Sequence, residues 1–168
     1  AERLVLWLDG HGERRLDGSA NHDLGEFGRQ LQQKGFRLNS VNLAVAQEVP
    51  ANAALLLIAS PQADLLPAEV QKIERHIRNG GNLLWLLDAE PLRGLQPVAE
   101  LLGLVLTPGV VVDPAAAQYR AGPTFAIGAA GSYARHPVTG TLQLNTVFPL
   151  ARQIGAAEKP RATDTRKP

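Results

Sequence analysis

His11 and Glu13 are the residues in this sequence best suited to chemistry, and they stand two apart in a glycine-rich stretch after an apolar run. Imidazole changes its charge near neutral pH, so a histidine beside a carboxylate can form an acid–base pair or supply half of a metal site. A histidine in such a turn more often hydrogen-bonds within the turn itself. The pair therefore indicates a polar loop but does not by itself identify a reaction.

Ser60 and Asp88 also follow apolar runs directly. Ser60 lacks the G-x-S-x-G pattern of serine hydrolases, and Pro61 has no backbone N–H that could serve as an oxyanion donor after the nucleophile. We therefore interpret Ser60 as a turn or capping residue. For Asp88 two roles stay open: a catalytic or phosphate-contacting carboxylate, and an acceptor of backbone N–H groups in its loop.

Several familiar sites are missing from the sequence. No two histidines have metal-ligand spacing, and the phosphate-binding patterns G-x-x-x-x-G-K-S/T and G-x-G-x-x-G do not occur. The chain has no cysteine, which removes thiol nucleophiles, zinc thiolates and disulfides together. We therefore expect no catalytic residues, no metal and no cofactor, and a protein that is not an enzyme.

The composition is that of a soluble globular domain of low net charge. Net charge is +1 and the hydrophobic fraction is 45%, so there is no basic stripe of the kind that binds nucleic acid. No apolar run approaches the roughly 20 residues of a membrane span. The sequence contains no Met, and we interpret it as a piece of a longer protein whose membrane segments would lie elsewhere.

Residues 65–88 predict the central unit of the fold. Pro67 suits the first turn of a helix, and Val70, Ile73 and Ile77 recur at the spacing of one helical face. Residues 83–87 then form an unbroken apolar run. Because a strand that is apolar on both faces must be covered on both, this run predicts a strand in the middle of a parallel sheet.

The rest of the chain alternates strands and helices, which is typical of an α/β fold with a mainly parallel sheet. Asp23 and Glu26 have the spacing of a capping box before a helix whose inward residues would be Leu24, Phe27 and Leu31. We predict an α/β domain over residues 1–154 with a β-rich C-terminal part, and a disordered tether over 155–168. The further predicted elements are strands at 4–8, 36–43 (near the sheet edge), 53–59, 104–106, 110–112, 124–127 and 146–150 (returning to the sheet edge), and a helix at 95–102.

Because parallel strands end at one rim of a sheet, three polar loops are expected to meet there, and ligands of such sheets bind where the strand order reverses. The loops are Gly10-His11-Gly12-Glu13, Ser60-Pro61-Gln62 and Asp88-Ala89-Glu90. We therefore predict a ligand-binding rim formed by Gly10, His11, Gly12, Glu13, Ser60, Pro61, Gln62 and Asp88.

Several short sequence motifs lie between Leu4 and Arg152. Their order and spacing resemble those of the GldG-like auxiliary domain of uncharacterised ABC-type transport systems, a domain that also occurs in gliding-motility transporters. The motifs are Gly10-His11-Gly12-Glu13, Val41-Asn42-Leu43 followed by Glu48-Val49-Pro50, Ser60-Pro61-Gln62-Ala63-Asp64-Leu65, Gly80-Gly81-Asn82-Leu83-Leu84 with Leu87-Asp88, Val111-Val112-Asp113-Pro114, His136-Pro137-Val138 and Phe148-Pro149-Leu150-Ala151-Arg152.

This resemblance implies a three-layer α/β sandwich, similar to class I glutamine amidotransferase-like and flavodoxin-like folds. It also implies a membrane-anchored parent that holds the domain on the extracytoplasmic (periplasmic) side of the cytoplasmic membrane, with ABC transporter permease and ATPase subunits as partners. Amidotransferase chemistry is not expected, since it needs a cysteine nucleophile and the chain has none.

The leading hypothesis is a non-catalytic extracytoplasmic domain that binds a small-molecule ligand of unknown identity or the transporter subunits. The alternative from another class is a hydrolase or metal-dependent enzyme that uses His11, Glu13 and Asp88 at the rim. A third interpretation is a cytoplasmic regulatory domain with a degenerate amidotransferase fold. Nothing in the residues selects a ligand or predicts a nucleic-acid partner.

Overall fold

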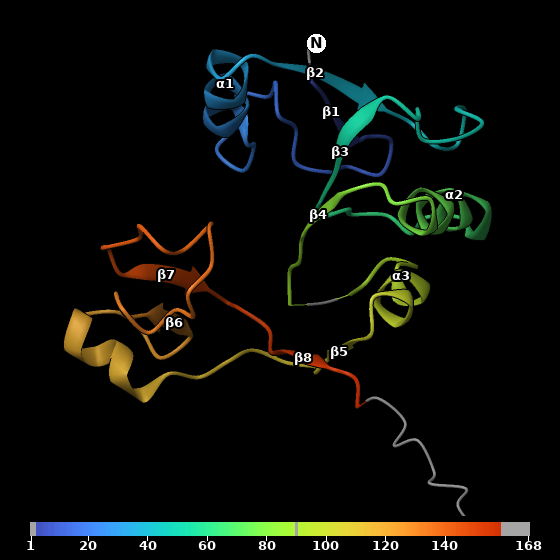
Figure 1. The fold of residues 1–168 in the computed structure, drawn as a ribbon. Coiled ribbons are helices and arrows are strands. Elements are labelled where there is room, and N and C mark those ends of the chain that lie inside the picture. The colour runs from blue at the N-terminus through green and yellow to red at the C-terminus, as the bar shows by residue number, and fades with distance from the viewer. Residues whose placement is uncertain (1–2, 90, 159–168) are drawn as a thin grey trace, which may run out of the picture.

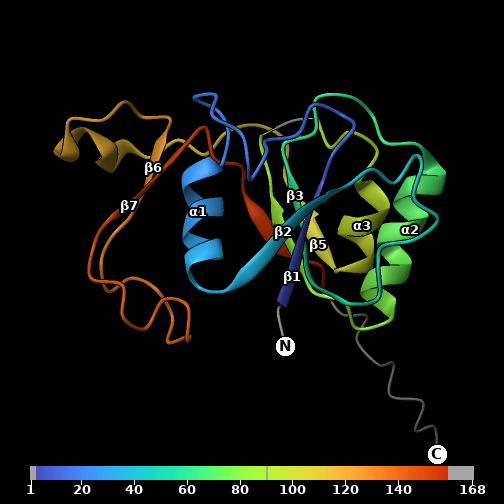
Figure 2. The same ribbon diagram turned by 90° about the horizontal axis from the view of Figure 1, so that it is seen from above.

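A four-stranded parallel sheet forms the centre of the protein in the computed structural model, which describes residues 3–89 and 91–158. Helix α1 (Gly25–Gln33) covers one face, and helices α2 (Pro67–Arg78) and α3 (Gln96–Leu101) cover the other (Figures 1 and 2). The predicted α/β fold with a parallel sheet flanked by helices is confirmed. The strands, in the spatial order β2-β1-β3-β4, are β1 (Arg3–Leu8), β2 (Phe36–Val41), β3 (Ala53–Ala59) and β4 (Leu83–Leu86).

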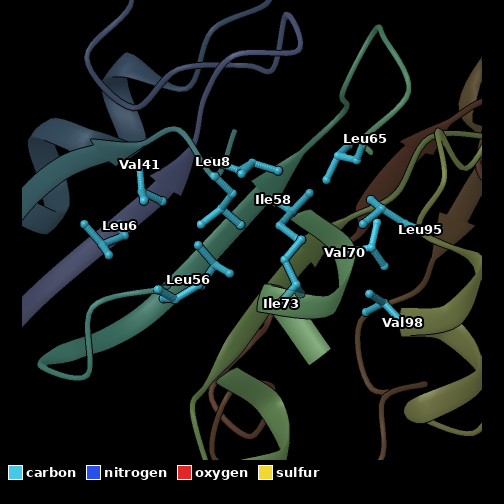
Figure 3. Packing of buried hydrophobic residues seen from close by; sticks show 12 residues of the cluster. Leu6, Leu8, Val41, Leu56, Ile58, Leu65, Val70, Ile73, Leu95 and Val98 are labelled. Atoms are coloured by element: carbon cyan, nitrogen blue, oxygen red, sulfur yellow. The ribbon is translucent and has the colours of Figure 1, made fainter. Parts of the chain in front are cut away.

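Alternating side chains of the two inner strands fill two separate cores. Leu6 and Leu8 of β1 belong to the core under α2 and α3, while Val5 and Trp7 belong to the core under α1. Each such side chain contributes roughly 1.5–3 kcal/mol when it is fully buried. The larger core is shown in Figure 3, where Leu6, Leu8, Leu56 and Ile58 of the sheet face Val70, Ile73 and Val98 of the helices.

Helix α2 begins and ends close to the predicted positions. Pro67 is its first residue, and Val70 and Ile73 are buried, as their spacing predicts. Glu69 does not belong to the apolar face formed by Val70, Ile73 and Ile77. Even so, only 2% of the residue is exposed. It lies one residue before Val70 in the first turn, on the side that faces the loop after β1.

The prediction that residues 83–87 form a central strand is wrong. β4 pairs only with β3 among the described strands, so it is an edge strand, and its residues are half-buried with Leu86 exposed. Leu83 and Trp85 pack on one core and Leu84 on the other. An unbroken apolar run indicates that both faces of a strand are covered by helices. It does not indicate how many strands pair with that strand. The other edge is β2, as expected.

Helix α1 packs through buried glycines as well as through the side chains of Leu24 and Leu31, which lie against the core under it. Phe27 is exposed, whereas Gly25 and Gly28 are buried, and a Cβ on Gly28 would overlap the carbonyl oxygen of Leu16. Asp23 does not cap the helix. Its carboxylate instead accepts hydrogen bonds from the backbone N–H of Arg15 and Ala20, at 3.0 and 3.1 Å. The predicted inward position of Phe27 is therefore wrong, because close backbone contact at the glycines replaces its burial, and the capping box is wrong, because the Asp23 carboxylate bonds to the preceding loop. The predicted inward positions of Leu24 and Leu31 are confirmed.

Two antiparallel strand pairs follow the sheet. β5 (Leu104–Leu106) pairs with β8 (Ile154–Ala156), and β6 (Phe125–Gly128) pairs with β7 (Thr146–Pro149). The strand predicted at 146–150 therefore pairs with β6 and not with the edge of the main sheet. The strand predicted at 110–112 is absent, although Val111 N–H donates to the carbonyl of Ala151 at 2.7 Å. A short 3₁₀ helix, η1 (Pro114–Tyr119), precedes β6.

The ordered strands extend past the predicted domain boundary at 154. Residues 155 and 156 were assigned to the tether because they have no large apolar side chain, yet they form part of β8. Strand pairing uses backbone groups, so it does not require such side chains. The remaining tether prediction for residues 159–168 lies outside the described residues. Among the helices of the described part, none is long and apolar enough to cross a membrane.

Candidate functional site

The loops that follow β1 and β3 meet at the same end of the sheet (Figure 2). The carbonyl of His11 accepts hydrogen bonds from the backbone N–H of Gln62 and Ala63, at 2.7 and 3.1 Å. β2 lies on one side of β1 and β3 on the other, so the strand order reverses at this point. Parallel sheets bind ligands at the carboxyl ends of their strands at such a reversal. The structure thus brings two of the three predicted rim loops into direct contact.

His11 joins two buried carboxylates. Its Nδ1 lies 3.2 Å from Oε1 of Glu13, and its Nε2 lies 3.1 Å from Oε2 of Glu69. The backbone N–H of His11 also donates to Oε2 of Glu13 at 2.8 Å. Glu13 is 5% exposed, so both carboxylates are removed from water. Each ring nitrogen of His11 thus lies within hydrogen-bond distance of one buried carboxylate.

Glu69 occupies this place because Leu66 at the start of α2 has no polar side chain to cap the helix. Oε2 of Glu69 accepts the backbone N–H of Leu66 at 2.8 Å and holds the first turn of α2 beside His11. Its Oε1 has no hydrogen-bond partner among the described residues. Sequence analysis missed this residue. One sequence feature could have indicated its role. Leu65 and Leu66 before Pro67 have no polar side chain, so the carboxylate of Glu69 is the group left to cap the first turn of the helix.

Arg14 connects three other segments of the rim through Ser60, His22 and Asp88. Its Nε donates to Oγ of Ser60 at 3.1 Å, and its Nη1 donates to the carbonyl of His22 at 3.0 Å. Its Nη2 lies 4.0 Å from Oδ2 of Asp88, which brings the loop after β4 into the same cluster. Ser60 is buried with a left-handed φ of 53°, so it forms the turn that the sequence indicated. Arg14 and His22 were not among the predicted site residues.

Two depressions open at this rim. One, of about 290 Å³, is lined by Gly12, Arg14, His22 and Gln62 and lies at the strand-order reversal. This volume is close to the roughly 300 Å³ at which small-molecule pockets begin. The other, of about 90 Å³, lies beside it and is lined by residues that include Ser60, Pro61, Gln62, Leu86, Asp88 and Arg93. We call the first one the rim cleft. Gly10 belongs to the same loop as Gly12 but does not line the rim cleft. Ligand binding by the predicted rim residues stays a prediction.

The three residues of the enzyme hypothesis are divided by the structure. His11 and Glu13 form a pair, whereas the charged contact of Asp88 is with Arg14. The carboxylates of Glu13 and Glu69 contact opposite ring nitrogens of His11, so they do not converge on one point. Within residues 3–89 and 91–158, no group of three or more His, Asp or Glu residues could hold a metal ion.

By its fold and its rim, the protein is a parallel α/β domain whose polar loops meet where the strand order reverses. The profile of the protein family described as "ABC-type uncharacterized transport system" matches residues 2–148, and the chain belongs to this family. The resemblance to the auxiliary domain of ABC-type transport systems is thereby confirmed.

Among solved structures, the chain is similar to one titled "mmIFT52 N-terminal domain", with a TM-score of 0.72 and 18% sequence identity. The similarity covers 92% of this chain and 68% of that one. At this identity the likeness shows the fold alone. No curated protein sequence matches the chain.

Proposed function

We propose that this chain is a non-catalytic binding domain of an auxiliary subunit in an ABC-type transport system. In this proposal a GldG-like, membrane-anchored parent holds the domain on the periplasmic side of the cytoplasmic membrane. The domain binds a ligand or the permease and ATPase subunits of the transporter. The family match over residues 2–148 is the observation that carries the proposal.

The rim cleft supports binding at this end of the sheet. Arg14 is held in place by Ser60 and the carbonyl of His22, and its side chain is still partly exposed. A fixed guanidinium keeps N–H groups available and loses little conformational freedom when a partner binds. Gln62 and His22 add hydrogen-bonding side chains at the same opening. A carbonyl-rich or carboxylate-bearing group is the chemistry that these donors recognise.

The polar residues of the rim support a binding role rather than a catalytic one. Both ring nitrogens of His11 contact protein carboxylates, and the hydroxyl of Ser60 accepts a hydrogen bond from Arg14. The order β2-β1-β3-β4 follows the flavodoxin-like order 2-1-3-4-5. Similarity to class I glutamine amidotransferases is part of the proposal, and without a cysteine such a domain would lack the nucleophile of those enzymes.

The experiment that tests this proposal is crosslinking of the tagged full-length parent in its native membranes, followed by mass spectrometry. Permease and ATPase peptides are expected among the crosslinked products. Arg14→Ala should reduce the yield of permease peptides at least several-fold, and Arg15→Ala on the neighbouring exposed side chain should not. Protease accessibility in spheroplasts should place the domain outside the cytoplasm. Absence of transporter peptides with the unmodified protein would refute the partner assignment, and protection from protease would refute the location.

The alternative of a hydrolase or metal-dependent enzyme rests on the hydrogen bond between His11 and Glu13. It predicts that a divalent metal raises the melting temperature by several degrees, because a ligand that binds only the folded state stabilises it. Loss of that rise in His11→Gln, with retention in His76→Gln, would favour the enzyme. An unchanged melting temperature with Zn²⁺, Mg²⁺ and Mn²⁺ would favour the binding domain.

A further inference from the structure

Residues 107–153 form a separate projection, which we call the arm. It contains η1 and the pair β6–β7, and Figures 1 and 2 both show it extending from the side of the molecule where α1 lies. Its two ends leave the β5–β8 pair together, since Thr107 N–H donates to the carbonyl of Gln153 at 3.2 Å. The β6–β7 pair contains only two strands, and such a ribbon is marginally stable alone. Within the arm, η1 contacts β6, and a further surface would add to the stability of the ribbon.

The arm exposes large apolar side chains on both sides of its ribbon. Val147 and Phe148 are consecutive residues of β7 and point to opposite faces, yet about half of each is exposed. Soluble monomers rarely expose large contiguous apolar patches without a binding role. The exposed large apolar residues of the arm are Val110, Val112, Tyr119, Phe125, Val138, Leu144, Val147, Phe148 and Leu150.

The arm contains more basic than acidic residues. Asp113 is the only acidic residue between positions 101 and 157. Its carboxylate is occupied within the arm, because it accepts the backbone N–H of Ala115 at 2.9 Å and of Ile127 at 3.1 Å. Arg120 and Arg135 are exposed at the surface. Residues 1–100, in contrast, contain 13 acidic and 10 basic residues and carry a net charge of −3.

We propose that the arm docks on the surface of an anionic lipid bilayer. Exposed aromatic and aliphatic side chains insert at the boundary between headgroups and acyl chains, and neighbouring arginines are attracted by anionic headgroups. Residues 1–100, with their net charge of −3, are repelled by the same surface, which orients the arm toward the lipid. This inference comes from the exposure and charge of the arm, and it does not depend on ligand binding at the rim.

Vesicle flotation with the 168-residue chain tests the proposal. The wild type is expected to float with vesicles of equal phosphatidylglycerol and phosphatidylcholine, and to float far less with phosphatidylcholine alone or at 0.5 M salt. Arg120→Gln/Arg135→Gln should weaken binding to the anionic vesicles about thirtyfold, since each basic residue near such a surface contributes about fivefold. The matched control is Arg29→Gln/Arg37→Gln, in α1 and β2 outside the arm. Its binding to anionic vesicles should stay within twofold of that of the wild type.

The apolar contribution has an equally matched control. Phe125 on the arm and Phe27 on α1 are each 38% exposed, so Phe125→Ser should lower binding about tenfold while Phe27→Ser leaves it unchanged. Leu144→Ser, in an exposed loop, gives the same readout without disturbing a strand, and thermal unfolding shows which variants are folded. Failure of the wild type to bind anionic vesicles, or equal losses in the arm and control variants, would overturn the proposal. A dimer in light scattering that the arm variants dissociate would also overturn it, by assigning the arm to a second copy of the chain.

Discussion

Nε2 of His11 lies 3.1 Å from Oε2 of Glu69, although 58 residues separate the two in the sequence. The contact joins the loop after β1 to the first turn of α2. The same carboxylate oxygen also accepts the backbone N–H of Leu66. The shape of the rim is therefore coupled to the position of the helix that covers the larger core.

Replacing His11 by Ala is expected to lower the free energy of unfolding by about 3 kcal/mol. The change would leave the carboxylates of Glu13 and Glu69 buried without their shared donor, and removing one partner of a buried charged group is costly. Urea unfolding followed by far-UV circular dichroism measures the change. His22→Ala, at an exposed position, should cost less than about 0.5 kcal/mol. Equal costs for the two variants would mean that the His11 contacts contribute little.

The partial exposure of Leu86 in β4 is tested by a matched pair of leucine truncations. Leu56→Ala in β3 should cost about 2–5 kcal/mol, because the side chain is fully buried. Leu86→Ala in β4 should cost less than about 1 kcal/mol, since that side chain is already partly in water. Chemical unfolding of both variants under one condition gives the comparison. A loss at position 86 as large as that at 56 would contradict the partial exposure of Leu86.

Gly28→Ala is expected to destabilise the protein by about 1–3 kcal/mol, although alanine favours helices. The added methyl group would overlap the carbonyl oxygen of Leu16, and a backbone atom can move aside only with the loop that carries it. Gln30→Ala, exposed on the same helix, is the control and should be neutral or slightly stabilising. Thermal unfolding measures both. A neutral Gly28→Ala would mean that α1 can shift away from the loop at little cost.

Asp23 should make stability depend on pH in the acid range. Hydrogen bonds from the backbone N–H groups of Arg15 and Ala20 lower the pKa of Asp23 below its ordinary value of 3.8. Its contribution is therefore complete above that value and is lost as the pH falls through the lower, folded-state pKa. Asp23→Asn should be less stable than the wild type at pH 7, and the gap should narrow toward pH 2.5. Urea unfolding at the two pH values checks this, and a gap that stays constant would contradict it.

Much of the fold could be predicted from the pattern of apolar residues. The strand over Ala53–Ala59 and the helix that begins at Pro67 are found as predicted, because an unbroken apolar run is typical of a strand covered on both faces, and an apolar repeat at three or four residues is typical of a helix. The arm was predicted poorly. Its strands are short and half-exposed, so they lack the regular apolar pattern by which the sequence locates a strand and its partner.

The sequence alone determined the class of this protein: an α/β domain with a parallel sheet, polar loops at one rim, no thiol chemistry, and the phrases of an ABC transport family. Those features follow from local pattern and residue type. Only the tertiary structure decided that Glu69 faces His11, that Arg14 holds Ser60, and that β4 stands at an edge. Each of these contacts depends on which distant segments of the chain come together. The side chains of one segment do not by themselves predict which residues of another segment will lie beside them.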